Sequence, residues 1–222
     1  MSRKSFSCCL VFCCVLSTSA SLLQASYTYP LEIFTNNGSF CNSSDLNLYV
    51  EVSNGKAEQV DFTFHNKSLI DSSIARIYFD DDLVLSDLLL NIVDITGGPG
   101  TSFSQPATPG NLPGGNLLVP QFVATEEFSF DGDPPVFHNG INPGEQLQIT
   151  FNINGGTVAA VIDGLNTNTI RVGTHVIALP DGSSESAVVT PEPATVALLG
   201  LGGLALIRRR RIESVKNNHK SC

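Results

Sequence analysis

Residues 46–65 read LNLYVEVSNGKAEQVDFTFH, and this stretch decides the fold class. Apolar side chains stand at every second position in both halves of the stretch, at Leu46, Leu48, Val50 and Val52 and then at Val60, Phe62 and Phe64. An alternation with a period of two is typical of half-buried strands. The sequence Ser-Asn-Gly between the two halves is a turn signal. The stretch therefore predicts two neighbouring strands, each with one face toward a core.

The chain on either side continues this pattern. Further candidate strands, with β-branched or aromatic residues at alternate positions, are 74–79, 88–95, 126–130, 147–153 and 170–179. Several strands at this spacing, separated by Gly- and Pro-rich turns, favour two packed antiparallel sheets. Residues 157–165 instead place apolar side chains at helical spacing behind Thr157, a candidate cap. The predicted fold is mainly β, a single antiparallel β-sandwich with one short crossover helix.

Residues 97–120 interrupt the strand pattern. Eleven of these 24 residues are glycine or proline, which excludes a long regular element. A loop of this length inside a compact domain is typically functional or mobile. We therefore expect an irregular loop here.

Charge is spread unevenly along the chain. The formal net charge is −9 over 222 residues, but residues 26–190 carry only four cations against 19 carboxylates, a net charge of −15. This acidic balance excludes a basic nucleic-acid binder. The hydrophobic content of 42% excludes a wholly disordered chain, and the length suits one domain with accessory segments.

The first 25 residues have the three parts of a secretory signal peptide. Arg3 and Lys4 precede an apolar run over residues 6–16, which small residues follow. We expect residues 1–25 to be a signal peptide that is cut after Ala20 or Ala25. An uncleaved N-terminal anchor is the alternative, which the shortness of the apolar run disfavours.

Cysteine usage predicts no disulfide framework. Four of the six cysteines lie in the expected signal peptide, and the other two are Cys41 and Cys222. These two lie on opposite sides of an apolar segment near the C-terminus, so we expect Cys41 to be a lone thiol.

The C-terminal end contains a short apolar segment between a proline motif and an arginine cluster. Pro191, Glu192 and Pro193 lead into the fourteen uncharged residues 194–207, and Arg208, Arg209, Arg210 and Arg211 follow at once. A helix of that length spans about 21 Å, which is less than the roughly 30 Å hydrocarbon core of a bilayer. Arginine side chains can hold such a helix end on the cytoplasmic side while their stems snorkel. We therefore expect a transmembrane helix here, with the body of the protein outside.

This order of elements resembles the PEP-CTERM sorting signal of Gram-negative bacteria that secrete exopolysaccharide. In that family a membrane-embedded transpeptidase, exosortase, recognises the tripeptide, cuts near it and releases or attaches the body at the cell surface. The resemblance implies that Pro191, Glu192 and Pro193 form the recognition motif and that Arg208 to Arg211 form the retention cluster. It also implies exosortase as a partner and transient residence in the inner membrane. An ordinary single-pass anchor is the alternative.

The body resembles a recurrent ectodomain attached to PEP-CTERM tails. The resemblance covers residues 46–185 and is carried by EVSNG, TSFSQPATPGNLPGGN, DPPVFHNGINPGEQLQITF and RVGTHV. It implies an architecture rather than an activity. The expected organisation is a signal peptide at 1–25, a β-sandwich ectodomain at 26–186, a linker at 187–193, a transmembrane sorting helix with its arginine cluster at 194–211 and a cytoplasmic tail at 212–222.

One acidic cluster is a candidate metal site. Asp80, Asp81 and Asp82 follow a candidate strand, and Asp87 lies nearby. Calcium prefers several oxygen ligands, which loops at a strand end can supply. The cluster therefore predicts either a calcium site or a solvated turn, and no other cofactor is expected.

No catalytic motif accompanies the histidines of the body. His65, His138 and His175 stand without a GxSxG or HExxH sequence, and His65 and His175 lie in candidate strands, which favours a surface or cross-strand role. Glycosidase-like carboxylate pairs stay open, because their spacing is spatial. The sequence predicts a non-enzymatic exported protein, and the resemblance to PEP-CTERM proteins implies that it is a surface or extracellular-matrix protein associated with exopolysaccharide or a biofilm matrix. The alternatives are a membrane-anchored adhesin and a polysaccharide-active enzyme.

Overall fold

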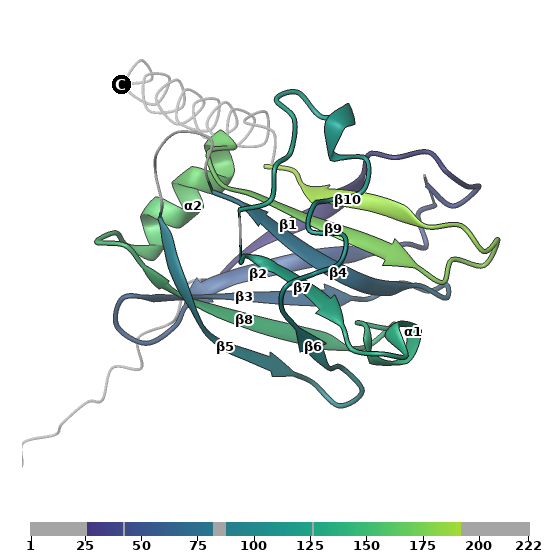
Figure 1. The fold of residues 1–222 in the computed structure, drawn as a ribbon, viewed down its shortest axis with the longest axis horizontal. Coiled ribbons are helices and arrows are strands. Elements are labelled where there is room, and N and C mark those ends of the chain that lie inside the picture. Colours follow the sequence, from purple (N-terminus) through teal and green to yellow (C-terminus); the bar gives the residue numbers. More distant parts are fainter. Residues whose placement is uncertain (1–25, 42, 82–87, 126, 192–222) are drawn as a thin grey trace, which may run out of the picture.

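The computed structural model describes residues 26–41, 43–81, 88–125 and 127–191 (Figure 1). The predicted signal peptide at 1–25, transmembrane helix at 194–211 and tail at 212–222 lie outside the described residues. Within the described ranges, no helix is long and apolar enough to cross a membrane.

Ten strands and three short helices make up the described body. The strands are β1 (Ser26–Ile33), β2 (Leu48–Asn54), β3 (Gln59–Asn66), β4 (Ser73–Asp80), β5 (Leu89–Gly97), β6 (Phe103–Ser104), β7 (Ser129–Gly132), β8 (Gln146–Ile153), β9 (Arg171–Ile177) and β10 (Glu185–Val189). The helices are the 3-10 helix η1 (Gly115–Leu117), α1 (Val136–Asn139) and α2 (Val158–Thr167). The mainly β prediction is confirmed.

The strands form one antiparallel sheet rather than two separate sheets. Their order is β5-β8-β3-β2-β1-β10-β9-β4-β7-β6. β1 joins the two halves, because Ser26 to Pro30 pair with β2 while Leu31 to Ile33 pair with β10. The two edge strands, β5 and β6, contact each other, so the sheet is curled and nearly closed. The sandwich prediction therefore differs from the structure in one respect: a shared strand makes both halves a continuous sheet.

The core lies inside this curled sheet and is rich in phenylalanine. Val50, Val52, Phe62 and Phe64, which the alternation in residues 46–65 placed on one face, are all fully buried. Phe79 of β4 lies at the centre, with its ring centroid 5.0 Å from that of Phe62 and 4.8 Å from that of Phe151. These edge-to-face contacts join strands from both halves of the sheet.

The predicted crossover helix is confirmed as α2. The hydroxyl of Thr157 accepts a hydrogen bond from the amide of Ala160 at 3.3 Å, and Asn168 ends the helix in the left-handed region, with φ of 57°. Val161, Ile162 and Leu165 are buried on its inner face. α2 connects β8 in one half of the sheet to β9 in the other, so it is a crossover as expected.

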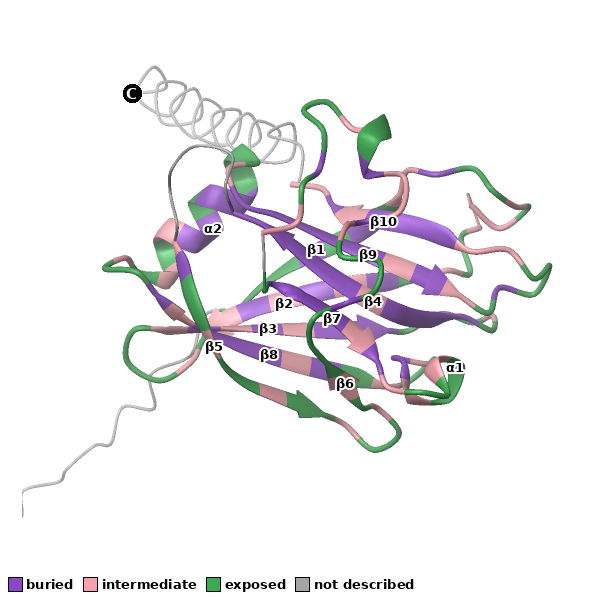
Figure 2. Ribbon diagram, in the orientation of Figure 1, coloured by how far each residue is buried: buried purple, intermediate pink, exposed green. Residues whose placement is uncertain are grey.

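The Gly- and Pro-rich segment is packed against the body, although a functional or mobile loop was expected. We call residues 98–125, which form most of the connection from β5 to β7, the covering loop. It contains β6 and η1 and buries Ala107, Leu112 and Phe122 against Tyr78 in a second hydrophobic cluster. Figure 2 shows why a second cluster is needed: β4 and much of β9 are buried along both faces.

Gly173 of β9 is the position that lets the covering loop approach. A Cβ atom at this residue would lie 2.6 Å from Leu112 Cδ2 and 3.3 Å from a ring carbon of Phe122. Real Cβ atoms do not approach other atoms that closely, so a larger residue here would force the side chain of Leu112 to shift.

The sequence patterns did not predict the two strands that join the halves of the sheet, β1 and β10. β10 extends to Val189, three residues into the range expected as a linker, and pairs with both β1 and β9. The folded body therefore continues almost to the proline motif.

Replacing Phe79 by Ala tests the importance of the aromatic core. Loss of this buried ring removes contacts to four other phenylalanines, so we expect the free energy of unfolding to fall by about 3–5 kcal/mol. Guanidinium denaturation followed by circular dichroism measures the change. The matched control is Phe137→Ala, whose ring is 53% exposed and whose loss should shift stability by about 0.5 kcal/mol or less. Equal effects of the two changes would contradict this description of the core.

Candidate functional site

The C-terminal proline motif begins where the central part of the sheet ends. Val189, the last residue of β10, pairs with Leu31 of β1, and the amide of Thr190 donates to the carbonyl of Pro30 at 3.3 Å. Pro191 is the last described residue and is half-buried. The other predicted sorting residues, Glu192, Pro193 and Arg208 to Arg211, lie outside the described residues. A cut near the proline motif would consequently leave every strand of the body intact.

The predicted calcium ligands Asp80 and Asp81 are buried rather than solvated, each with 1% of its surface exposed. The carboxylate of Asp80 pairs with the guanidinium of Arg171 and accepts the amide of Val123 at 3.0 Å. The carboxylate of Asp81 accepts the amide of Leu89 at 2.7 Å. The solvated-turn alternative is therefore wrong for both residues, and the guanidinium at Asp80 disfavours a cation there.

Asp82, the third predicted ligand, lies outside the described residues, and the calcium site stays a prediction. Among the residues that the structure describes, no group of three His, Cys, Asp or Glu side chains could hold a metal ion.

The guanidinium of Arg171 in β9 binds the covering loop through hydrogen bonds to two of its carbonyl groups. One of its terminal nitrogens, Nη1, donates to the carbonyl of Pro120 at 2.7 Å, and the other, Nη2, donates to the carbonyl of Gln121 at 2.6 Å. Its guanidinium carbon also lies 5.1 Å above the centre of the Phe122 ring. The Arg171–Asp80 pair thus satisfies backbone groups of a segment that forms no ladder hydrogen bonds there.

A polar depression lies on the outer face of the other half of the sheet. It has a volume of about 360 Å³, and its lining includes Lys56, Gln59, Asp61, Asp94, Gln148 and Thr150. β3, β5, β8 and the turn between β2 and β3 supply these residues. Figure 2 shows that β5 and this turn are largely exposed.

Hydrogen bonds between neighbouring strands hold the polar groups of this face in place. Thr150 Oγ1 donates to Asp61 Oδ1 at 2.6 Å, and Gln148 Nε2 donates to Thr150 Oγ1 at 3.3 Å. A second row of side chains crosses β3, β8 and β5. Gln59 Nε2 donates to Asn152 Oδ1 at 3.1 Å, and Asn152 Nδ2 donates to Asn91 Oδ1 at 3.1 Å. The face consequently presents ordered amide, hydroxyl and carboxylate groups, the hydrogen-bonding groups that recognise hydroxyl-rich ligands. Sequence reasoning missed it, because its residues are distant along the chain.

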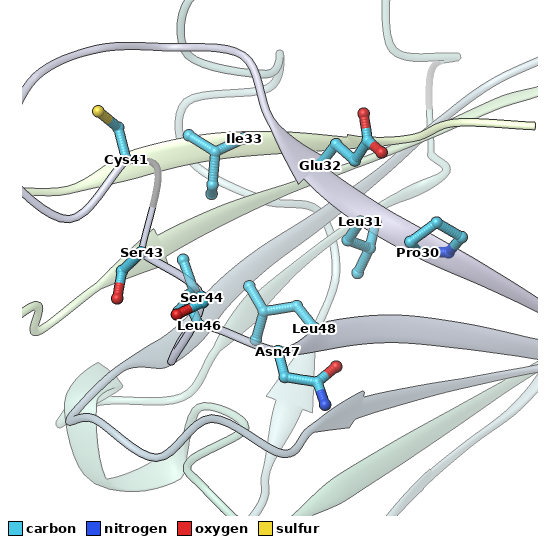
Figure 3. Close-up of a pocket in the computed structure, with 10 residues that line it drawn as sticks. All are labelled: Pro30, Leu31, Glu32, Ile33, Cys41, Ser43, Ser44, Leu46, Asn47 and Leu48. Carbon is cyan, nitrogen blue, oxygen red and sulfur yellow. The ribbon is translucent and has the colours of Figure 1, made fainter.

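A second hollow, of about 400 Å³, lies between β1 and the segment that precedes β2 (Figure 3). Leu31, Ile33 and Leu46 supply its apolar lining, and Glu32 extends away from them. Cys41 stands at its rim, and its thiol donates to Asn36 Oδ1 at 3.1 Å. The other five cysteines lie outside the described residues, so the lone-thiol expectation for Cys41 stays a prediction.

His65 and His175 make cross-strand contacts, as expected from the sequence. The ring of His65 stacks on Tyr49 of β2 with centroids 4.7 Å apart, and its Nε2 lies 3.7 Å from Glu51 Oε2. His175 Nδ1 lies 3.3 Å from the hydroxyl of Ser186 on β10. Burial lowers the pKa of both imidazoles, and the nearby charge of Arg76 lowers the pKa of His175 further.

These lowered pKa values predict a pH dependence of stability. The unfolded chain binds protons near pH 6.5, whereas the folded chain binds them only at lower pH, so the free energy of unfolding is greatest above pH 6.5 and falls as the pH drops below it. We expect the double change His65→Gln with His175→Gln to flatten this slope between about pH 5 and 6.5, as measured by urea denaturation. The exposed His138→Gln is the control. A slope that persists in the double variant would contradict the assignment.

Comparison with known proteins identifies the C-terminal end of the chain. No curated protein and no solved structure matches the chain. The model of the PEP-CTERM protein-sorting motif matches residues 189–211. The match begins at the last residue of β10 and includes the proline tripeptide, the apolar segment and the arginine cluster. The chain therefore carries a PEP-CTERM protein-sorting motif, which implies export, processing by exosortase and sorting to the cell surface.

Proposed function

We propose that the body of this chain is a non-enzymatic binding module of the cell surface or extracellular matrix. Exosortase detaches it from the tail at Pro191 to Pro193. The released body then associates with exopolysaccharide. Its route would be export by the signal peptide, transient anchoring in the inner membrane by residues 194–211, and then transfer to the surface or the medium. The observation that carries the binding role is the ordered polar face around the depression at Asp61 and Thr150.

The chemistry of this face suits sugar hydroxyl groups. Amide side chains donate and accept hydrogen bonds, as hydroxyl groups do, and the carboxylate of Asp61 is a strong acceptor. Because Gln59, Asn152 and Asn91 are held by one another, a ligand would lose little side-chain entropy in binding them.

Charge narrows the class of polysaccharide. The net charge of −15 over residues 26–190 repels anionic polymers, and only Lys56 is a cation among the residues that line the depression. A neutral, hydroxyl-rich glycan is therefore the preferred ligand.

One observation favours the polysaccharide-active enzyme as a second candidate. Asp61 of β3 and Asp94 of β5 both line the depression, and each is in register with Thr150 of the strand between them. Two strand spacings place their Cα atoms about 10 Å apart, which allows the carboxylate separation of an inverting glycosidase. Release of reducing sugar from a neutral glucan that stops in both Asp61→Asn and Asp94→Asn would favour the enzyme over the binding module.

The sorting proposal predicts the C-terminus of the mature protein. In the native host, intact-mass measurement should find a chain that ends near Pro193 and lacks residues 194–222. Replacing Pro191, Glu192 and Pro193 by alanine should leave the arginine cluster attached and the protein in the membrane fraction. A wild-type chain that retains Arg208 to Cys222 would instead indicate an ordinary anchor and overturn the proposal.

The binding proposal predicts that the polar face governs retention in gels that contain a neutral glucan. The double change Gln59→Ala with Asn152→Ala removes two hydrogen-bonding amides, and we expect a loss of affinity of about tenfold or more. Affinity electrophoresis measures it. Asn116→Ala, an exposed amide on η1, is the matched control and should bind as the wild type does. Equal retention of all three proteins would exclude the polar face as the binding surface.

A further inference from the structure

The covering loop belongs to a stretch that has no charge. Residues 95–125 contain no Asp, Glu, Lys, Arg or His, although the body around them has a net charge of −15. A strongly acidic body thus contains a long segment without charge.

This uncharged segment also exposes apolar side chains. Leu112 and Phe122 of the covering loop are buried over Gly173, while Leu117, Val119 and Val123 point outward with 64%, 97% and 52% of their surfaces exposed. Scattered exposed apolar residues are ordinary, but three within seven residues of an uncharged loop are a candidate contact surface. We call these three residues the apolar edge.

The apolar edge lies at the end of the sheet where the chain leaves the body. Arg171, which binds the carbonyl of Pro120, is two residues before Gly173, and Gly173 is opposite Val188 in the β9–β10 ladder. Thr190, two residues after Val188, is consequently at the same end of these antiparallel strands as Arg171. Figure 1 agrees, with the covering loop beside the end of β10.

The length of chain that follows keeps this end of the body close to the apolar segment 194–207. Only four residues separate Val189 from Ala194, and fully extended chain spans at most about 3.6 Å per residue, or roughly 18 Å in all. The body cannot turn its far end toward the lipid while the tail is anchored.

We propose that the apolar edge, Leu117, Val119 and Val123, contacts the lipid surface while the tail anchors the chain, and leaves it when the tail is cut. This inference rests on the proposed function, since it needs residues 194–211 in the membrane. Anionic lipids repel the acidic parts of the body, whereas the uncharged loop can approach the headgroups without that cost. Apolar side chains at the interface add area removed from water.

The absence of tryptophan from the chain allows a direct test. Val119→Trp in the full chain is a single fluorescent probe, and the high exposure of Val119 means that the change need not disturb the core. The protein is reconstituted into vesicles of phosphatidylcholine with phosphatidylglycerol. We expect the emission to move to shorter wavelength, and brominated phosphatidylcholine to quench it.

Leu69→Trp is the matched control. Leu69 is 85% exposed and lies shortly before Ser73, the first residue of β4. Asp80 and Arg171 lie at the other end of β4, so position 69 is far from the apolar edge. The emission of a tryptophan at position 69 should therefore stay that of a solvated indole. Flotation of the vesicles reports separately whether the tail inserts. A protein that floats but shows no blue shift and no quenching at Val119→Trp overturns the inference alone. Equal shifts at both positions indicate non-specific adsorption and also overturn it. A protein that does not float overturns the membrane role of the tail, and the inference with it.

Discussion

The buried ion pair of Arg171 and Asp80 is the interaction on which the rest of the structure depends. It joins the neighbouring strands β9 and β4 at one end of the sheet, and both partners are almost fully buried. A buried ion pair is stable only when further hydrogen bonds satisfy its remaining groups. The covering loop supplies three such bonds, through Pro120, Gln121 and Val123, and leaves Arg171 Nε without a partner among the described residues, so the pair and the loop stabilise each other. The second hydrophobic cluster forms because the loop is held there.

Most strands that the sequence predicted have one buried and one solvated face, whereas β4 and β9 were predicted from their β-branched and aromatic residues although both of their faces are largely buried. In β2 and β3 the alternation is visible, because Val50 and Phe62 face the core while Glu51 and Thr63 do not. The sequence pattern did not predict β1 and β10, for a different physical reason in each strand. Pro30 within β1 is unusual for a strand between two neighbours, and Glu185 of β10 is fully buried because the hydroxyl of Thr35 and the amides of Asn37 and Gly38 donate to it. A charge hidden in this way has no signature in the sequence pattern.

The candidate sites also differ in whether the sequence could predict them. A sorting motif is contiguous, so its tripeptide, apolar segment and arginines could be read from the order of residues, and the match to residues 189–211 confirms it. The polar face could not be predicted, because Asp61, Asn91 and Thr150 are brought together only by the pairing of β3, β8 and β5. The acidic cluster is also contiguous, and its role as a calcium site stays a prediction. Adjacent aspartates predicted oxygen ligands, whereas the fold uses Asp80 as a counter-ion and Asp81 to bind the amide that begins β5.

The position of β10 links folding to sorting. β10 lies between β1 and β9, so the two halves of the sheet are joined only when β10 pairs with β1, and this pairing of Val189 with Leu31 spans almost the whole body. Contacts between residues so distant in sequence form late, since the entropy of closing the loop opposes them. The sorting segment begins at the same residue, so the last strand of the sheet and the sorting motif are adjacent in the chain. Because a cut beyond Val189 removes no paired residue, the completed sheet keeps all its ladder hydrogen bonds after the tail is gone. The described strands thus end before the proline motif begins, and a cut at that motif leaves their pairing unchanged.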